Sequence, residues 1–192
     1  MRICVYGGAS VKIDPDYIRA TEILGEKMAK RGHDLVFGAG GTGLMGAIAK
    51  GVSDGGGKVL GVIPRFFLDK NVEIVADHCD EVIYTDTMRE RKQIMEDSAD
   101  AFIMTPGGIG TFEEFFEILT LKQLGQLNKP IVIFNHKNYY VELVDMMEHS
   151  IEKKFINDAV QTLYSVFEDA DELLDFIEND KGTSLTVDEL KK

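Results

Sequence analysis

Short apolar runs alternate along the chain with longer segments in which apolar residues recur every three or four positions. Such runs predict strands, and the periodic segments predict helices. Strands are predicted at 2–6, 34–37, 58–63, 81–85, 101–105 and 130–135, with a further short strand near 161–165. Helices are predicted at 15–31, 43–54, 87–98, 111–124, 139–153 and 170–179. This alternation is typical of α/β proteins with a doubly wound parallel sheet flanked by helices.

The ends of these segments carry local signals. Asp14 before Pro15 predicts a helix start. The carboxylate can accept hydrogen bonds from the unpaired N–H groups of the first helical turn, and proline at the first helical position gives up no hydrogen bond within the helix. The stretch 65–80 has no clear period, so we expect a long loop over the carboxyl edge of the sheet. We expect one domain over residues 1–180 and a polar, frayed tail over residues 181–192.

Composition narrows the range of partners. The 192 residues carry a net charge of −12, which disfavours binding to nucleic acids and anionic membranes. No apolar run approaches the roughly 20 residues of a membrane span, so a cytoplasmic location is expected. The two cysteines lie far apart and no histidine stands at ligand spacing, so neither a disulfide framework nor a metal site is predicted.

Two glycine-rich turns follow predicted strands. The first, Gly38-Ala39-Gly40-Gly41-Thr42-Gly43, satisfies the GxGxxG pattern of dinucleotide sites. It follows the second strand rather than the first, and about 20 residues later Ile63-Pro64-Arg65 stands where an acidic residue would contact the ribose hydroxyls of NAD. Close backbone packing explains these glycines at least as well.

The second turn, Pro106-Gly107-Gly108-Ile109-Gly110-Thr111, lies between a strand and a helix. Glycines let a phosphate approach the backbone, and the helix start adds the positive end of its dipole. No lysine follows, so a monophosphate fits better than a triphosphate with magnesium. Thr111 and Glu114 also form a possible capping box. Glu113 and Glu114 point about 100° apart on a helix, so at most one faces a ligand squarely.

Three cations stand in the segment Met88-Arg89-Glu90-Arg91-Lys92. A solvated helix face, with a pair between Lys92 and Glu96, is one interpretation. A site for an anionic sugar phosphate is the other, because a guanidinium stays charged at all physiological pH values. None of the four histidines is assigned a catalytic role.

Two segments of the chain, in this order, resemble the signatures MHxRK and PGGxGTxxE of the LONELY GUY family. They are Met88-Arg89-Glu90-Arg91-Lys92 and Pro106-Gly107-Gly108-Ile109-Gly110-Thr111-Phe112-Glu113-Glu114. The resemblance runs from Arg2 to about Asp175. It implies a homodimeric, Rossmann-like fold and a phosphoribohydrolase of cytokinin biosynthesis that acts on cytokinin riboside 5′-monophosphates, often also on AMP. No cofactor is implied. Members were often labelled lysine decarboxylases, but no recognisable context for a Schiff-base lysine occurs here.

The resemblance also implies the roles of particular residues. It makes Arg91 and Glu114 the catalytic pair, and the choice of Glu114 over Glu113 depends on it. Arg89 stands where the family has His, and Leu121 stands where many members carry Trp, and these departures bear on base preference. The substrate-binding positions that it implies are Glu73, Met88, Arg91, Lys92, Gly107, Gly108, Ile109, Gly110, Thr111, Phe112, Glu113, Glu114 and Thr120.

Two other functions remain consistent with the sequence. A non-catalytic nucleotide or cofactor carrier on the same fold would need only the phosphate turn. An NADP-dependent oxidoreductase would use the turn from Gly38 to Gly43.

Overall fold

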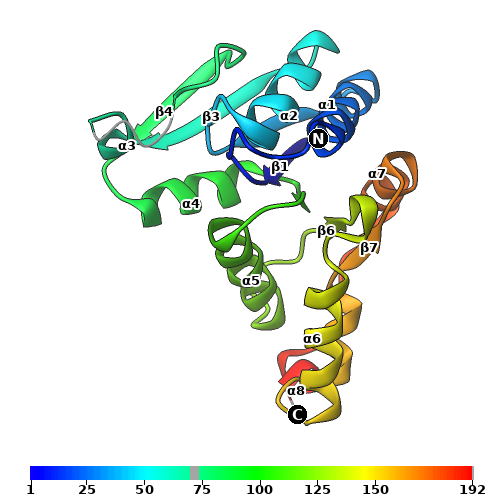
Figure 1. The fold of residues 1–192 in the computed structure, drawn as a ribbon. Helices are drawn as coiled ribbons and strands as arrows, with labels where there is room; N and C mark the ends of the chain where they lie inside the picture. The colour runs from blue at the N-terminus through cyan, green and yellow to red at the C-terminus, as the bar shows by residue number, and fades with distance from the viewer. Residues whose placement is uncertain (70–73, 192) are drawn as a thin grey trace.

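The computed structural model describes residues 1–69 and 74–191, which form a seven-stranded parallel sheet with helices on both faces (Figure 1). The strand order is β4-β3-β2-β1-β5-β6-β7, and neighbouring strands pair in parallel throughout. This arrangement confirms the predicted α/β doubly wound sheet. The strands are β1 (Arg2–Tyr6), β2 (Asp34–Phe37), β3 (Val59–Pro64), β4 (Glu81–Thr85), β5 (Ala101–Met104), β6 (Ile131–Phe134) and β7 (Ser165–Phe167).

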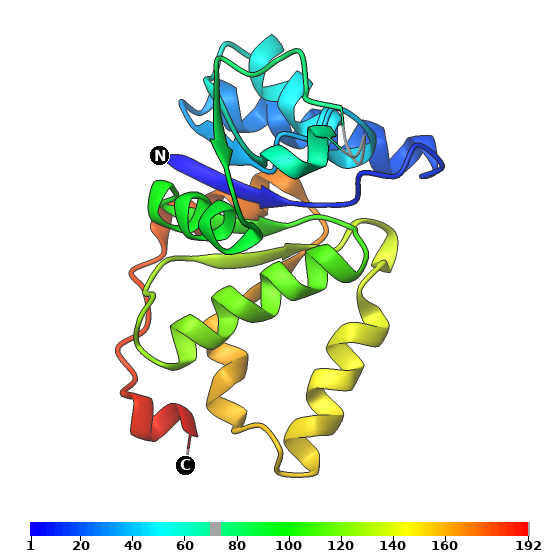
Figure 2. The same cartoon turned by 90° about the vertical axis from the view of Figure 1, so that its left-hand side faces the viewer.

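The helices divide between the two faces. Figure 2 shows α1 and α2, in blue and cyan, on one side of the sheet, and α5 and α6, in green and yellow, on the other. The helices are α1 (Pro15–Lys30), α2 (Gly43–Asp54), α3 (Arg65–Asp69), α4 (Met88–Ser98), α5 (Ile109–Gln123), α6 (Val141–Glu152), α7 (Ala170–Asn179) and α8 (Val187–Lys191), with short 3-10 helices η1 (His136–Asn138) and η2 (Asp158–Leu163).

Alternation along the strands builds two apolar layers. Ile3 and Val5 of β1 pack with α1, α2 and α7, whereas Cys4 and Tyr6 pack with α4 and α5. Successive side chains of a strand point to opposite faces, so one apolar run supplies both layers. Within the described residues, no helix is both long enough and apolar enough to cross a membrane.

The order in which strands are added to the sheet reverses at β1. Strands β2, β3 and β4 extend the sheet on one side of β1, and β5, β6 and β7 extend it on the other. The loops after β1 and β5 therefore diverge to opposite faces and leave a crevice at the carboxyl edge. Ligands of open α/β sheets bind at such switch points.

The predicted strand near 161–165 is displaced in the structure. Residues Asp158–Leu163 form η2, and β7 begins only at Ser165. The side-chain oxygen of Asn157 accepts a hydrogen bond of 2.8 Å from the backbone N–H of Ala159. This hydrogen bond favours a helical turn over an extended chain.

Two segments expected to be irregular contain helices. The stretch 65–80 begins with α3, and Val75 bridges Gly40. The expectation of a frayed end is wrong, because α8 packs Leu190 into the core with 1% of its surface exposed. Thr186 and Glu189 form reciprocal capping hydrogen bonds at the start of α8.

Candidate functional site

At the carboxyl edge of the sheet, the loops after β1, β2 and β5 meet beside a cavity of about 250 Å³, which is lined by the loops after β1 and β5 and by residues of α2, α3, α4 and α5. Backbone hydrogen bonds join the three loops: the amide of Gly8 donates to the carbonyl of Pro106 at 3.0 Å, and the amide of Leu44 donates to the carbonyl of Gly8 at 2.7 Å. The hydroxyl of Thr42 donates to the carbonyl of Ala9 at 2.6 Å. The loops after β1, β2 and β5 are thereby held as one unit at the switch point.

The turn after β5 presents open backbone to this cavity. Gly108 is the N-cap of α5, and a methyl group added at Gly108 or Gly110 would meet no atom within 4 Å. The first amides of a helix have no carbonyl partner within it, and the helix dipole attracts anions to them. The side chain of Thr111 is buried and lines the cavity beside these amides. The turn can therefore hold a phosphate group.

Helix α5 begins earlier than the sequence predicts. Its first residue is Ile109 rather than residue 111, so Thr111 lies inside the first turn and Glu114 in the second. The capping box proposed for Thr111 and Glu114 is therefore wrong. Gly108 has no side chain that could cap the helix, so the sequence carries no capping signal at this helix start.

Arg91 of α4 is the cation of the cavity. Its residue surface is 7% exposed, its Nε donates to the carbonyl of Val62 at 3.1 Å, and its Nη1 lies 3.4 Å from Oε1 of Glu114. The ring of Phe67 lies 5.9 Å from the guanidinium carbon. The solvated-face interpretation is wrong for this residue. Arg91 is fixed in place and directed at the carboxylate of Glu114.

Gly38 makes room for this guanidinium. A Cβ atom at position 38 would lie 1.7 Å from Nη2 of Arg91. Gly43 of the same turn is also constrained, since a Cβ atom there would lie 2.6 Å from the carbonyl oxygen of Gly8. Close packing therefore accounts for Gly38 and Gly43 of the GxGxxG pattern, as the packing interpretation predicts.

The two adjacent glutamates differ in their surroundings. The side chain of Glu114 is 11% exposed and faces Arg91, whereas that of Glu113 is 54% exposed and lies 2.5 Å from Nζ of Lys92. Lys92 also lies 2.5 Å from Glu117. Burial acts to lower the pKa of Lys92, but hydrogen bonds to these two carboxylates raise it above its ordinary value. Lys92 is a charged, ion-paired group.

The structure brings together part of the predicted substrate-binding set. Gly107 lines a neighbouring cavity, Ile109 is 86% exposed, and the ring of Phe112 lies 6.2 Å from that of Tyr140. The hydroxyl of Thr120 donates to the carbonyl of Phe116. Glu73 lies outside the described residues. The predicted residues that line the 250 Å³ cavity are Met88, Arg91, Gly108, Gly110, Thr111, Glu113 and Glu114.

Sequence reasoning missed other residues of the cavity. Gly7, Gly8 and Ala9 follow β1, and Met45 and Phe67 come from α2 and α3. The glycine pair after the first strand was an available signal, because it marks a close backbone approach at the carboxyl edge. Phe67 lies in a five-residue helix that is too short to show a period.

Across residues 1–69 and 74–191, no group of three or more His, Cys, Asp and Glu side chains is arranged to hold a metal ion.

Known sequences match this chain over most of its length. A family model described as "Possible lysine decarboxylase" matches residues 45–177. Cytokinin riboside 5′-monophosphate phosphoribohydrolase LOG2 of Arabidopsis thaliana is 38% identical over 177 residues, which cover 92% of this chain and 82% of that protein. Probable cytokinin riboside 5′-monophosphate phosphoribohydrolase LOG4 of Oryza sativa subsp. japonica is 40% identical over 172 residues, which cover 90% of this chain and 74% of that protein.

Solved structures share the fold. The molybdenum cofactor carrier protein of Chlamydomonas reinhardtii superposes with a TM-score of 0.70 at 21% identity, covering 92% of this chain and 95% of that one. The molybdenum cofactor binding protein of the phototrophic bacterium Rippkaea orientalis gives a TM-score of 0.70 at 21% identity, covering 92% and 94%. At this identity the likeness establishes the common Rossmann-like architecture.

Proposed function

Because this chain belongs to the family of the LOG cytokinin riboside 5′-monophosphate phosphoribohydrolases, we propose that it hydrolyses the N-glycosidic bond of a nucleoside 5′-monophosphate. The products are the free base and ribose 5-phosphate. One observation carries the proposal: Arg91 and Glu114 face each other in a cavity whose wall is the open glycine turn at the start of α5.

Glu114 is the group that stabilises the transition state. Breaking the bond to the base builds positive charge on the ribose ring, and a neighbouring carboxylate stabilises that charge. The bonding electrons leave with the base, water adds its hydroxide to C1′, and the remaining proton ends on the base. The low exposure of Glu114 limits screening of its charge by solvent.

The phosphate turn supplies binding energy away from the broken bond. The amides of Ile109, Gly110 and Thr111 hold the 5′-phosphate, and Arg91 fixes the sugar phosphate relative to Glu114. Binding energy from such a remote group is used to orient the reacting bond. Free nucleosides should therefore be poor substrates.

The names of the relatives give the substrate class. We extend the cytokinin riboside 5′-monophosphates of those names, together with AMP, to this chain. Arg89 and Leu121, on α4 and α5, are the departures that bear on the choice of base. Incubation with a panel of nucleoside 5′-monophosphates, followed by chromatography of the released bases, tests the function and ranks the bases.

The same incubation distinguishes the hydrolase from a carrier, and a separate incubation with lysine tests a decarboxylase. A carrier would bind AMP and release no adenine, whereas we expect stoichiometric adenine and ribose 5-phosphate. A lysine decarboxylase would release carbon dioxide from the substrate lysine. Such an enzyme uses one of its own lysine side chains to form a Schiff base, and the amine of that side chain must lose its proton to react. Lys92, the lysine beside the cavity, is stabilised in its charged form by two carboxylates, which favours the hydrolase.

Replacing Gly110 should separate substrate binding from folding. In Gly110→Ala the new methyl group enters the space where the phosphate binds, so KM for AMP should rise roughly tenfold or more, in line with the loss of one or two charge-assisted hydrogen bonds. The melting temperature should hold or increase, because alanine is the better helix former. Steady-state kinetics and thermal denaturation measure both. Equal KM values for AMP and adenosine in the unaltered protein would contradict a phosphate role for this turn.

We also propose a cytoplasmic homodimer that binds neither nucleic acid nor membranes. The homodimer is what the resemblance to the LONELY GUY family implies, and the net charge of −12 supports the absence of polyanionic partners. We expect light scattering of an active sample to give twice the 21.4 kDa chain mass. A monomeric mass at full activity would contradict the dimer.

A further inference from the structure

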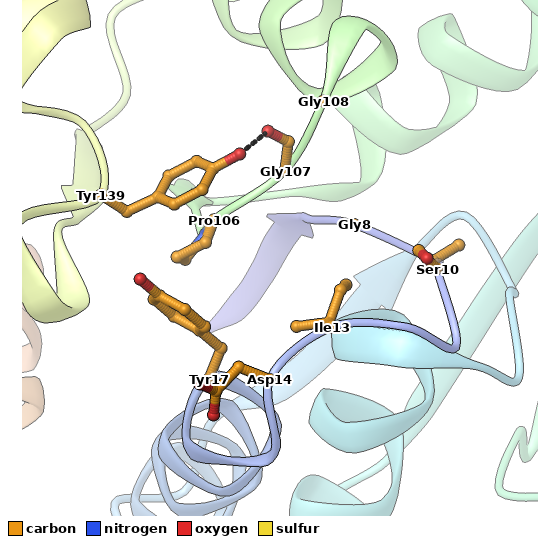
Figure 3. Close-up of a pocket in the computed structure, with 10 residues that line it drawn as sticks. Gly8, Ser10, Ile13, Asp14, Tyr17, Pro106, Gly107, Gly108 and Tyr139 are labelled. Atoms are coloured by element: carbon orange, nitrogen blue, oxygen red, sulfur yellow. Dashed lines mark hydrogen bonds between the residues drawn. The ribbon is translucent and has the colours of Figure 1, made fainter.

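Two adjacent tyrosines, which we call the tyrosine pair, donate hydrogen bonds to the turn that follows β5. The hydroxyl of Tyr139 donates to the carbonyl of Gly107 at 2.7 Å (Figure 3), and the hydroxyl of Tyr140 donates to the carbonyl of Thr105 at 2.7 Å. The partners are separated by 32 and 35 residues along the chain. The turn is therefore held by tertiary contacts from the segment between β6 and α6.

A hydrogen bond to a backbone carbonyl orients the whole peptide group. A peptide group is planar and trans, so its N–H points opposite to its C=O. The carbonyl of Gly107 and the N–H of Gly108 belong to one such group, and Tyr139 binds its carbonyl end. The N–H of Gly108 therefore points away from Tyr139. Gly108 lines the cavity that contains Arg91 and Glu114, and Tyr139 lies outside that lining.

The backbone before the tyrosine pair has an uncommon conformation. Lys137 and Asn138 have φ angles of 55° and 58°, in the left-handed region that residues with a side chain rarely adopt. The side-chain oxygen of Asn135 accepts a hydrogen bond of 2.7 Å from the N–H of Tyr140. Such a conformation costs free energy, persists only where surrounding contacts determine it, and is concentrated at functional sites. Here it precedes two adjacent side chains that both reach the same turn.

Packing keeps the tyrosine pair in one orientation. Tyr140 is 1% exposed, and its ring meets those of Tyr139 and Phe112 edge to face, with centroids 4.8 and 6.2 Å apart. The ring of Tyr139 also meets that of Tyr17 edge to face at 5.8 Å. Burial raises the pKa of Tyr140, so its hydroxyl keeps its proton and remains a donor. The turn is thus oriented before a ligand arrives, which lowers the entropy lost on binding.

From these contacts we propose that Tyr139 and Tyr140 are positioning residues for the phosphate turn. They act through the backbone: their hydroxyls hold the carbonyls of Gly107 and Thr105, and the N–H of Gly108 is thereby directed to the phosphate group. Donors that are oriented in advance stabilise an anion without reorganisation. The assignment of that anion to a nucleotide or sugar phosphate rests on the proposed function, whereas the held carbonyls are independent of it.

Calorimetric titration with ribose 5-phosphate tests the tyrosine pair without turnover. Tyr139→Phe and Tyr140→Phe each remove one hydroxyl and keep the ring. Each should weaken ribose 5-phosphate binding roughly three- to tenfold, the range for loss of one hydrogen bond. KM for AMP should rise by the same factor while kcat stays within about twofold, because the phosphate is remote from the broken bond.

Tyr164→Phe is the matched control. Tyr164 is half-buried, its ring lies 5.8 Å from that of Phe115, and it lines neither the cavity of Arg91 nor the pocket beside Tyr139. Loss of its hydroxyl should leave ribose 5-phosphate affinity unchanged. Thermal denaturation of all variants checks the fold. Because Tyr139 is 40% exposed, Tyr139→Phe should fold even if Tyr140→Phe does not.

The outcomes separate positioning from a structural role. Ribose 5-phosphate affinity that is unaltered in both Tyr139→Phe and Tyr140→Phe overturns the proposal, even if their melting temperatures fall and AMP is hydrolysed. A loss in kcat at unchanged KM also overturns it, as does a lack of binding of ribose 5-phosphate and inorganic phosphate to the unaltered protein. Weaker ribose 5-phosphate binding in Tyr139→Phe, in a protein that never hydrolyses AMP, supports the tyrosine pair and contradicts the hydrolase.

Discussion

Replacement of Glu114 by glutamine is expected to lower kcat for AMP by roughly 10²-fold or more, the scale of lost electrostatic or general-base assistance. Glutamine keeps the shape of the side chain and an oxygen that can accept from Nη1 of Arg91, so only the charge is removed. Binding of AMP should persist, because the glycine turn is unchanged. Single-turnover kinetics and AMP titration measure the two effects separately.

Glu117→Gln is the matched control for this substitution. Glu117 lies one helical turn further along α5, pairs with Lys92 at 2.5 Å and is 37% exposed, so loss of its charge should leave most of the activity. Melting temperatures of both variants check the fold. Turnover by Glu114→Gln at the unaltered rate, with unchanged melting temperature, would end the catalytic assignment.

Replacement of Arg91 by lysine should also cost roughly 10²-fold in kcat/KM, which corresponds to about 2.7 kcal/mol of transition-state stabilisation. The guanidinium donates to Val62 and reaches Glu114 with nitrogens in one plane. A lysine ammonium has the charge but not this planar fork, so it cannot make both contacts in the same geometry.

The control for Arg91→Lys is the same exchange at Arg19, an exposed residue of α1. Arg19→Lys preserves the net charge, and we expect kcat/KM for AMP to change little. If the two exchanges had equal effects, the guanidinium of Arg91 would have no particular role.

Most of the fold could be predicted from the sequence because strands buried on both faces are continuous apolar runs. Residues 131–134 and 101–104 read as strands on this ground alone, and both are fully buried. The start of α5 could not be predicted as readily, since Gly108 offers no capping side chain and glycine is a poor helix former. Near residue 160 a local side-chain cap from Asn157 competes with strand formation.

The site was less accessible to sequence reasoning, because its decisive contacts join elements that are distant in the chain. The burial of Arg91 depends on Gly38 and on the carbonyl of Val62, which belong to other strands and loops. Lys92 follows Arg91 directly, yet α5 binds it with two carboxylates. Local sequence shows three cations in one helical turn but cannot show which of them is enclosed.

The fit of the Arg91 guanidinium against Gly38 has an evolutionary consequence. The two positions form an epistatic pair, since a side chain at 38 displaces the guanidinium only in a chain that has arginine at 91. The order of substitutions therefore matters: while position 91 is arginine, a larger residue at 38 displaces the guanidinium and with it the proposed chemistry, whereas after the arginine is lost this conflict is absent. In a chimera, the β2–α2 loop and helix α4 should be exchanged together.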